Sequence, residues 1–150
     1  KMKKLLTLSF IALTLFACKK DAATTNGGST ANGANTFTWT DNTVTYNCDS
    51  AYASAQYKTI FVYKGGSATR YFFEINLTGL SVANYPFTTS GNALAYIRPG
   101  TTSSLLTSFA GALAITANAN NKITGAGVAT VNSSTLGERI NFTFTDLPVR

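Results

Sequence analysis

The chain has 150 residues, with 12 lysines and arginines against 6 aspartates and glutamates, which gives a formal net charge of +6. Three of the lysines lie in the first four residues and the other basic residues are scattered, so the sequence lacks the concentrated basic surface that nucleic acid requires, and we exclude nucleic-acid binding. Histidine is absent, which excludes Ser-His-Asp and Cys-His nucleophiles and the commonest zinc ligand sets.

Residues 1–17 have the parts of a secretory signal peptide. Lysines within residues 1–4 precede an apolar stretch over residues 5–17, and Cys18 follows directly. A stretch this short does not reach the roughly 20 residues of a membrane-spanning helix. A cysteine after a small residue at this place is typical of a bacterial lipobox, in which the Cys18 sulfur is lipidated and the chain is cut before it. We therefore predict a lipoprotein signal peptide that starts at Met2 and a lipid anchor at Cys18.

Residues 18–35 form a predicted flexible linker. Lys19, Lys20 and Asp21 follow the cysteine, and after them come only alanine, threonine, asparagine, glycine and serine. Such a segment has no apolar side chain large enough to build a core. The charges next to Cys18 resemble the export signal of Bacteroidota surface lipoproteins. We therefore expect an outer-membrane lipoprotein of the cell envelope that is surface-exposed or faces the periplasm.

Residues 36–150 are predicted to form one β-sandwich domain. Alternation of apolar and polar residues with period two dominates this region, and turn residues recur every 8 to 12 positions. This spacing favours an all-β fold, an antiparallel β-sandwich or partly closed barrel of about 8–9 strands. The predicted strands are residues 36–40, 44–48, 57–64, 68–78, 85–89, 93–98, 109–116, 123–131 and 139–145.

Some segments depart from the regular alternation or allow a more specific prediction. Residues 49–56 are predicted to be a loop, and residues 103–108 are compatible with a helical turn. In the strand that follows, Phe109 is expected on one face together with Gly111, Leu113 and Ile115. Gly125 and Gly127 share a face of their strand, where a large side chain or the backbone could approach closely. The residues expected to point inward from the last strand are Ile140, Phe142 and Phe144.

A few residues are candidates for binding or modification. Asp49-Ser50-Ala51 resembles the acceptor triplet for O-glycosylation in Bacteroidota, which makes Ser50 a candidate glycosylation site in the predicted loop. With Cys18 lipidated, Cys48 has no intramolecular disulfide partner and is expected to be a buried structural residue. Aromatic side chains that are not needed in the core could bind a glycan or an envelope protein, and the candidates are Trp39, Tyr57, Tyr63 and Phe72.

Enzymatic activity is not expected. Glu74 and Glu138 could form the facing carboxylates of a glycosidase, but ordinary surface charges are the favoured interpretation. The sequence holds no calcium-binding loop and no glycine-rich phosphate loop. We therefore predict no catalytic residue, no metal site and no cofactor.

The C-terminal half resembles small Bacteroidota lipoproteins that carry a domain of unknown function. The segments with this resemblance are Gly111 to Thr116, Ile123-Thr124-Gly125 and Phe142 to Val149. The resemblance implies an all-β fold and an envelope location, and it brings no catalytic residue. The expected function is that of a lipid-anchored, non-enzymatic binding or structural module. The alternative is a β-barrel carrier of a small apolar ligand, suggested by inward-facing glycines.

Overall fold

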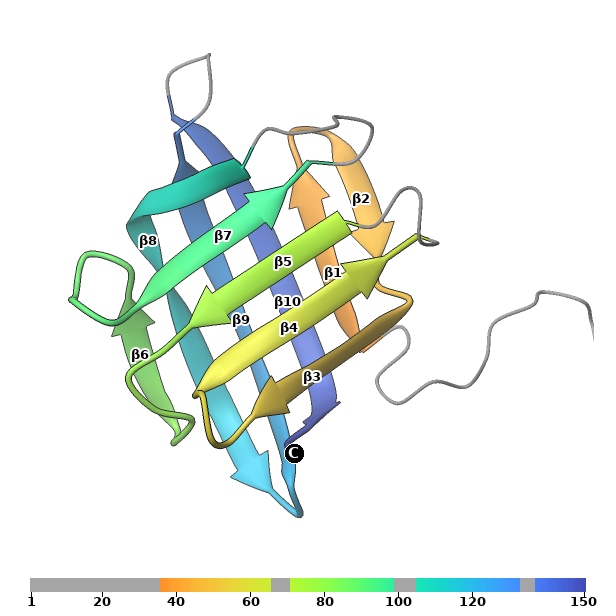
Figure 1. Cartoon of the computed structure of the whole chain (residues 1–150), viewed down its shortest axis with the longest axis vertical. Coiled ribbons are helices and arrows are strands. Elements are labelled where there is room, and N and C mark those ends of the chain that lie inside the picture. The colour runs from red at the N-terminus through yellow and green to blue at the C-terminus, as the bar shows by residue number, and fades with distance from the viewer. Residues whose placement is uncertain (1–35, 66–70, 99–104, 133–136) are drawn as a thin grey trace, which may run out of the picture.

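The structure is a computed structural model that describes residues 36–65, 71–98, 105–132 and 137–150, with the backbone alone for Tyr71 and Phe72. The predicted signal peptide, the linker and the lipidation site Cys18 lie outside the described residues. Within them every regular element is a β-strand, which confirms the predicted all-β class (Figure 1). The strands are β1 (Phe37–Asp41), β2 (Val44–Asn47), β3 (Ser50–Ser54), β4 (Thr59–Lys64), β5 (Tyr71–Asn76), β6 (Ala83–Pro86), β7 (Ala93–Ile97), β8 (Leu105–Ala119), β9 (Lys122–Val131) and β10 (Glu138–Pro148).

One antiparallel sheet joins these strands in the order β2-β1-β10-β9-β8-β7-β5-β4-β3, and β6 pairs with β8 beside this path. The sheet curls, so that β3, β4, β5 and β7 form one layer in front of a second layer of β1, β8, β9 and β10 (Figure 1). We call the side chains between the two layers inner and those on the opposite face of each strand outer. This curled half-barrel agrees with the predicted sandwich or partly closed barrel.

The long strand β8 belongs to both layers. It pairs with β7 through Leu105 to Thr107 and with β6 through Ala112 to Ile115. Between these two segments the register against β9 shifts, and Gly111 has a φ of 106°. A Cβ atom at Gly111 would lie 2.0 Å from the carbonyl oxygen of Val128, so only glycine fits here. The bulge bends the strand from one layer into the other.

A short bridge joins the edge strand β3 to the chain just beyond β10. Ala53 of β3 forms a parallel bridge with Val149, just beyond β10. The Arg150 N–H donates to the Ala53 carbonyl at 2.9 Å, and the Ala55 N–H donates to the Arg150 carbonyl at 2.8 Å. These bonds satisfy backbone groups that an open edge strand would leave unpaired. The barrel is therefore partly closed at the corner where the chain ends.

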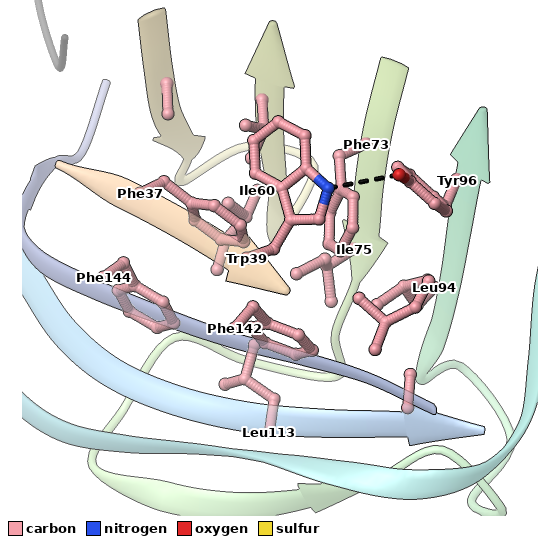
Figure 2. Close-up of a cluster of buried hydrophobic side chains, with 14 of the residues drawn as sticks. Phe37, Trp39, Ile60, Phe73, Ile75, Leu94, Tyr96, Leu113, Phe142 and Phe144 are labelled. Atoms are coloured by element: carbon pink, nitrogen blue, oxygen red, sulfur yellow. Dashed lines mark hydrogen bonds between the residues drawn. The ribbon is translucent and has the colours of Figure 1, made fainter. Parts of the chain in front are cut away.

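Aromatic side chains fill the space between the layers (Figure 2). The Phe73 ring lies between the layers, with its centroid 5.2 Å from that of Tyr96, 5.3 Å from Phe37 and 5.7 Å from Phe142. Each of these four residues is at most 2% exposed. Tilted and edge-to-face contacts between buried rings add to the stabilisation from burying their area. The centre of the molecule is thus a packed aromatic core.

The predicted close approach at the two glycines of β9 is confirmed. Gly127 pairs with Phe142, and Gly125 pairs with Phe144. A Cβ atom would lie 2.3 Å from the Phe142 Cζ atom at Gly127 and 2.6 Å from the Phe144 Cζ atom at Gly125. The phenylalanine rings of β10 therefore lie directly over the glycine backbone of β9, and the inward orientation of Ile140, Phe142 and Phe144 is as predicted.

Two local predictions are wrong. Residues 49–56 are not a loop, because β3 pairs along its whole length with β4. Its inner residues are Ala51 and Ala53, which are small because the aromatic core already fills the space, so the segment lacked the usual strand signature. The suggested helical turn over 103–108 is also wrong, since β8 begins at Leu105.

The predicted face of Phe109 is wrong as well. Its ring is 56% exposed, whereas Leu113 and Ile115 are buried. The register shift beside Phe109 and the bend at Gly111 break the alternation that would have placed all three on one face.

Candidate functional site

The four aromatic candidates lie in different environments. Trp39 is a core residue, 2% exposed, and its Nε1–H donates to the Tyr96 hydroxyl at 3.2 Å. Tyr57 lies in the β3–β4 turn and is 67% exposed. Tyr63 is half-buried on the outer side of β4, and Phe72 lies opposite it on β5. The Phe72 side chain lies outside the described residues. Only Tyr63 therefore belongs to a larger surface that the structure describes.

That surface, which we call the outer aromatic face, covers the front layer of the molecule. It consists of the outward side chains of Tyr52, Phe61, Tyr63, Ile97 and Leu105. Tyr52 pairs with Phe61, and Ile97 pairs with Leu105. The first four are half-buried, and Leu105 is 57% exposed. Each of these residues alternates with inner core residues, so the strand period places them all on the outside.

The rings of the outer aromatic face cover one another. The Tyr52 centroid lies 5.3 Å from that of Phe61 and 6.4 Å from that of Tyr63, and the Tyr52 and Tyr63 planes differ by only 19°. The Arg150 guanidinium carbon lies 4.8 Å from the Tyr52 ring centroid, a cation–π contact. Beside this face Lys64 forms an ion pair with Asp49 at 3.3 Å. The arrangement is an aromatic and aliphatic surface that also carries a carboxylate, because Glu74 of β5 lies opposite Phe61 on the same outer side.

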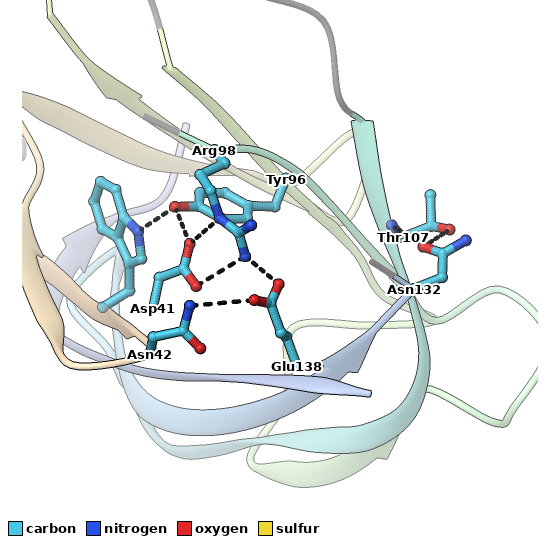
Figure 3. A network of polar contacts seen from close by, with 8 residues as sticks. Asp41, Asn42, Tyr96, Arg98, Thr107, Asn132 and Glu138 are labelled. Carbon is cyan, nitrogen blue, oxygen red and sulfur yellow. Dashed lines mark hydrogen bonds and ion pairs between the residues drawn. The ribbon is translucent and has the colours of Figure 1, made fainter. Parts of the chain in front are cut away.

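A second group of residues forms a partly buried polar network at one end of the molecule (Figure 3). Arg98 donates from Nε to Asp41 Oδ2 at 2.8 Å and from Nη2 to Asp41 Oδ1 at 3.2 Å, and it also pairs with Glu138. The Tyr96 hydroxyl donates to Asp41 Oδ2 at 3.1 Å, and Asn42 Nδ2 donates to Glu138 Oε1 at 3.2 Å. We call Asp41, Tyr96, Arg98 and Glu138 the arginine clamp. It links β1, the end of β7 and β10.

The electrostatics of the arginine clamp favour fixed protonation states. Hydrogen bonds to Asp41 and then Glu138 raise the pKa of the Arg98 guanidinium above its ordinary value. Burial, the largest cause, raises the pKa of the Tyr96 hydroxyl well above its ordinary value, and the negative charge of Asp41 adds to this effect. Arg98 therefore stays charged and Tyr96 stays protonated near neutral pH. A group that must exchange a proton in catalysis needs a pKa closer to the working pH, so the geometry fits a structural cross-link.

Sequence reasoning missed the arginine clamp, although the alternation held a signal for it. The predicted first strand ends at residue 40, but Asp41 shares the inner face of β1 with Phe37 and Trp39 and is 4% exposed. Arg98 likewise follows the inner residues Leu94 and Tyr96 by the same period. A carboxylate and a guanidinium that both point into a core must pair, since an isolated buried charge is very costly.

The structure does not bring the two candidate hydrolytic carboxylates together. Glu138 belongs to the arginine clamp, whereas Glu74 lies on the outer side of β5 and accepts a hydrogen bond from Asn76 Nδ2 at 3.0 Å. Because Glu74 is on the outer side of the front layer, opposite Phe61, while Glu138 pairs with Arg98, no facing pair forms. Glu74 and Glu138 thus do not have the arrangement that glycoside hydrolysis requires.

A third region is the outer face of the back layer, which we call the threonine face. Two rows of paired residues cross five strands from β2 to β8 without a charged side chain. One row is Thr45, Thr40, Asn141, Val128 and Ala112, and the other is Asn47, Thr38, Thr143, Ala126 and Ala114. An open hollow of about 210 Å³ lies in this face, lined by Thr38, Trp39, Thr40, Ala126, Gly127, Asn141, Phe142 and Thr143.

Ser50, the candidate glycosylation site, is the first residue of β3 and is half-buried opposite Tyr63. The predicted loop around it is wrong, while its modification stays a prediction. Cys48 is 2% exposed in the core, as expected of a structural residue. Among the described residues, no group of three or more histidine, cysteine, aspartate or glutamate side chains is placed to hold a metal ion.

Within the described ranges, no helix has the length and apolar character needed to cross a membrane. Comparisons with protein-family models, curated proteins and solved structures find no significant match to this chain. The resemblance to Bacteroidota lipoproteins therefore stays a prediction from the sequence.

Proposed function

We propose that this protein is a lipid-anchored lipoprotein of the bacterial cell envelope whose β domain is a non-enzymatic binding module. Cys18 at the end of a short apolar leader supports the anchor, and residues 19–35 have the composition of a tether. The arginine clamp supports a non-enzymatic role, because its titratable groups are paired and bridge strands.

The observation that carries the binding role is the outer aromatic face. Interfaces between proteins combine an apolar centre, enriched in aromatic residues and arginine, with a charged and polar rim. Tyr63 and Leu105 supply apolar surface, Arg150 lies over Tyr52, and the Glu74 carboxylate lies opposite Phe61 on the same face. This composition suits an envelope protein that presents an apolar surface of its own.

A protein partner fits this face better than a glycan does. A sugar that stacks on an aromatic residue needs an open ring face. One side of the Tyr52 ring is covered by Arg150, and the Tyr52 ring also packs against Tyr63 and Phe61. The three rings are each only half-buried, and Leu105 adds an exposed aliphatic side chain that a sugar ring cannot stack on.

The alternative function, a carrier of a small apolar ligand, requires an interior cavity of at least ~300 Å³. The aromatic core occupies the space between the layers where such a ligand would sit (Figure 2). No specific observation favours this alternative, and it stays a prediction.

The anchor is tested by growing cells that produce the full chain with radiolabelled palmitate. We expect label in the wild-type protein and its recovery in the membrane fraction, and neither in Cys18→Ala. A wild-type protein with an unmodified Cys18 thiol, established by mass spectrometry, would refute the lipid anchor.

The binding surface is tested by placing a photo-crosslinking amino acid at Leu105 and, as the matched control, at Thr45 on the threonine face. Both sites are exposed, so both probes can reach a neighbour. We expect one discrete adduct from the Leu105 probe only, weakened by Tyr63→Ser, and a complex of the same composition when the purified partner is mixed with the full chain. Equal products from both probes, or none from either, would contradict the proposed face.

A further inference from the structure

The hollow in the threonine face lies on the opposite layer from the outer aromatic face, and its chemistry is different. No lysine, arginine, aspartate or glutamate lines it. An anion would need basic side chains or a helix N-terminus, and a cation would need carboxylates. The hollow therefore suits an uncharged ligand.

The walls of the hollow carry hydroxyl and amide groups that retain hydrogen-bonding capacity. The Thr38 and Thr143 hydroxyls lie 2.9 Å apart, so one donates to the other and the acceptor keeps its own O–H free to donate. Asn141 is exposed, and its amide makes no side-chain hydrogen bond within the part of the chain that the structure describes. Both donors and acceptors are thus present among the residues of β1 and β10 that line the hollow.

The floor of the hollow is apolar and low because β9 contributes only small residues. Ala126 pairs with Thr143 on one side and with Ala114 on the other, and Gly127 comes next in the strand. Gly127 is required for an unrelated reason, the Phe142 ring on the inner side. The outer surface is therefore a step, with hydroxyl groups on β1 and β10 standing above the methyl group of Ala126.

From this geometry we propose that the hollow is a binding subsite for one neutral sugar ring of an envelope or extracellular glycan. A pyranose ring has hydroxyl groups at its edge, which match Thr38, Thr143 and Asn141, and an apolar C–H face, which matches Ala126. The volume of about 210 Å³ is below the ~300–1,000 Å³ of pockets for drug-sized ligands. It therefore holds one ring, while the adjoining rows of the threonine face are free to contact the next units.

This proposal is independent of the lipid anchor and of the outer aromatic face. The test is a titration of the isotope-labelled full chain with methyl glycosides of glucose, galactose, mannose and N-acetylglucosamine, followed through backbone amide NMR shifts. Inorganic phosphate is the charged comparison. We expect saturable shifts on β1, β9 and β10 with at least one glycoside, at a dissociation constant of about 1 mM, and none with phosphate.

Two pairs of variants locate the site. Thr143→Val removes the hydroxyl at nearly constant shape and is expected to weaken binding about three- to tenfold, while Thr145→Val, on the same side of β10 but outside the hollow, leaves it unchanged. Ala126→Leu fills the hollow and is expected to abolish binding, while Thr116→Leu, at an exposed position of β8 outside the hollow and the two rows, does not. Thermal unfolding of each variant confirms that it is folded.

Each contrary outcome overturns the proposal. The hollow is not a sugar subsite if none of the four glycosides gives saturable shifts, if the shifts map to other strands, or if folded Ala126→Leu binds as the wild type does. Saturable binding of phosphate at the same amides would assign the hollow to an anion and would also refute the neutral ligand.

Discussion

Arg98 reaches from the end of β7 to the last residue of β1 and binds both carboxylate oxygens of Asp41. The Nε and Nη2 contacts are 2.8 and 3.2 Å long, and Asp41 is 4% exposed. These two residues are 57 positions apart in the chain. Their pairing joins the front and back layers at an end of the molecule where the sheet order leaves β7 and β1 unpaired.

We predict that Arg98→Met lowers the free energy of unfolding by about 2–4 kcal/mol, because it leaves the buried Asp41 carboxylate without its charge partner. Chemical denaturation followed by the fluorescence of Trp39, the one tryptophan of the chain, measures this loss. The matched control is Lys64→Met, which removes the ion-pair partner of the exposed Asp49 and should cost under about 1 kcal/mol, because an exposed carboxylate is solvated by water without its partner. Equal losses in the two variants would show that the arginine clamp contributes no more than a surface ion pair.

Tyr96 should make stability fall at alkaline pH. Burial raises the pKa of its hydroxyl above the ordinary value of about 10. Above that pH the unfolded chain releases the Tyr96 proton while the folded protein retains it, so deprotonation favours unfolding by up to about 1.4 kcal/mol per pH unit. Below that pH both states keep the proton, and this group contributes no pH dependence.

The measurement compares the free energy of unfolding between pH 8 and pH 11 in the wild type and in Tyr96→Phe. The variant loses the hydrogen bonds with Trp39 and Asp41, so it is less stable at every pH, but its stability should decline less steeply above about pH 10. Parallel declines would mean that Tyr96 titrates in the folded protein as it does in the unfolded chain.

Gly127→Ala should destabilise the protein by about 1–3 kcal/mol. The new Cβ atom would lie 2.3 Å from the Phe142 Cζ atom and 2.8 Å from the Ala112 carbonyl oxygen, so movement of the ring alone does not relieve the contact. Gly79→Ala is the control, since its Cβ atom would be 3.4 Å from the nearest atom, the Tyr85 hydroxyl oxygen. The double variant of Gly127→Ala with Phe142→Leu should show part of the loss recovered, and purely additive losses would place the strain elsewhere.

Several features of the fold could be predicted from the sequence because they depend on local periodicity. Strand β10 shows this most clearly, since Ile140, Phe142 and Phe144 alternate with polar residues and do point inward. The break between the predicted strands 109–116 and 123–131 contains a turn, in which Asn120 and Asn121 have φ angles of 52° and 56°, a conformation that asparagine tolerates. Likewise, two glycines on the same face of one strand, Gly125 and Gly127, indicated that large side chains or the backbone of a neighbouring segment would lie close to the backbone there.

The candidate surfaces were less accessible to sequence reasoning. Tyr63 was named in advance, but Tyr52 lies in a segment that was predicted to be a loop, because alanines replace the large inner residues of an ordinary strand. The threonine face depends on register, since Thr38, Thr143 and Ala126 become neighbours only when β1, β10 and β9 pair.

The sequence by itself determined the all-β class and which residues share a face in most strands, because both depend on residues that are close together in the chain. The lipid anchor at Cys18 stays a prediction from the sequence. Tertiary structure alone decided that Arg98 meets Asp41 and Glu138, that Phe109 faces outward and that the sheet curls at Gly111. These features depend on strand order, on register and on a bulge, which are set by how the whole core packs. They cannot be inferred from the alternation of apolar and polar residues along one strand.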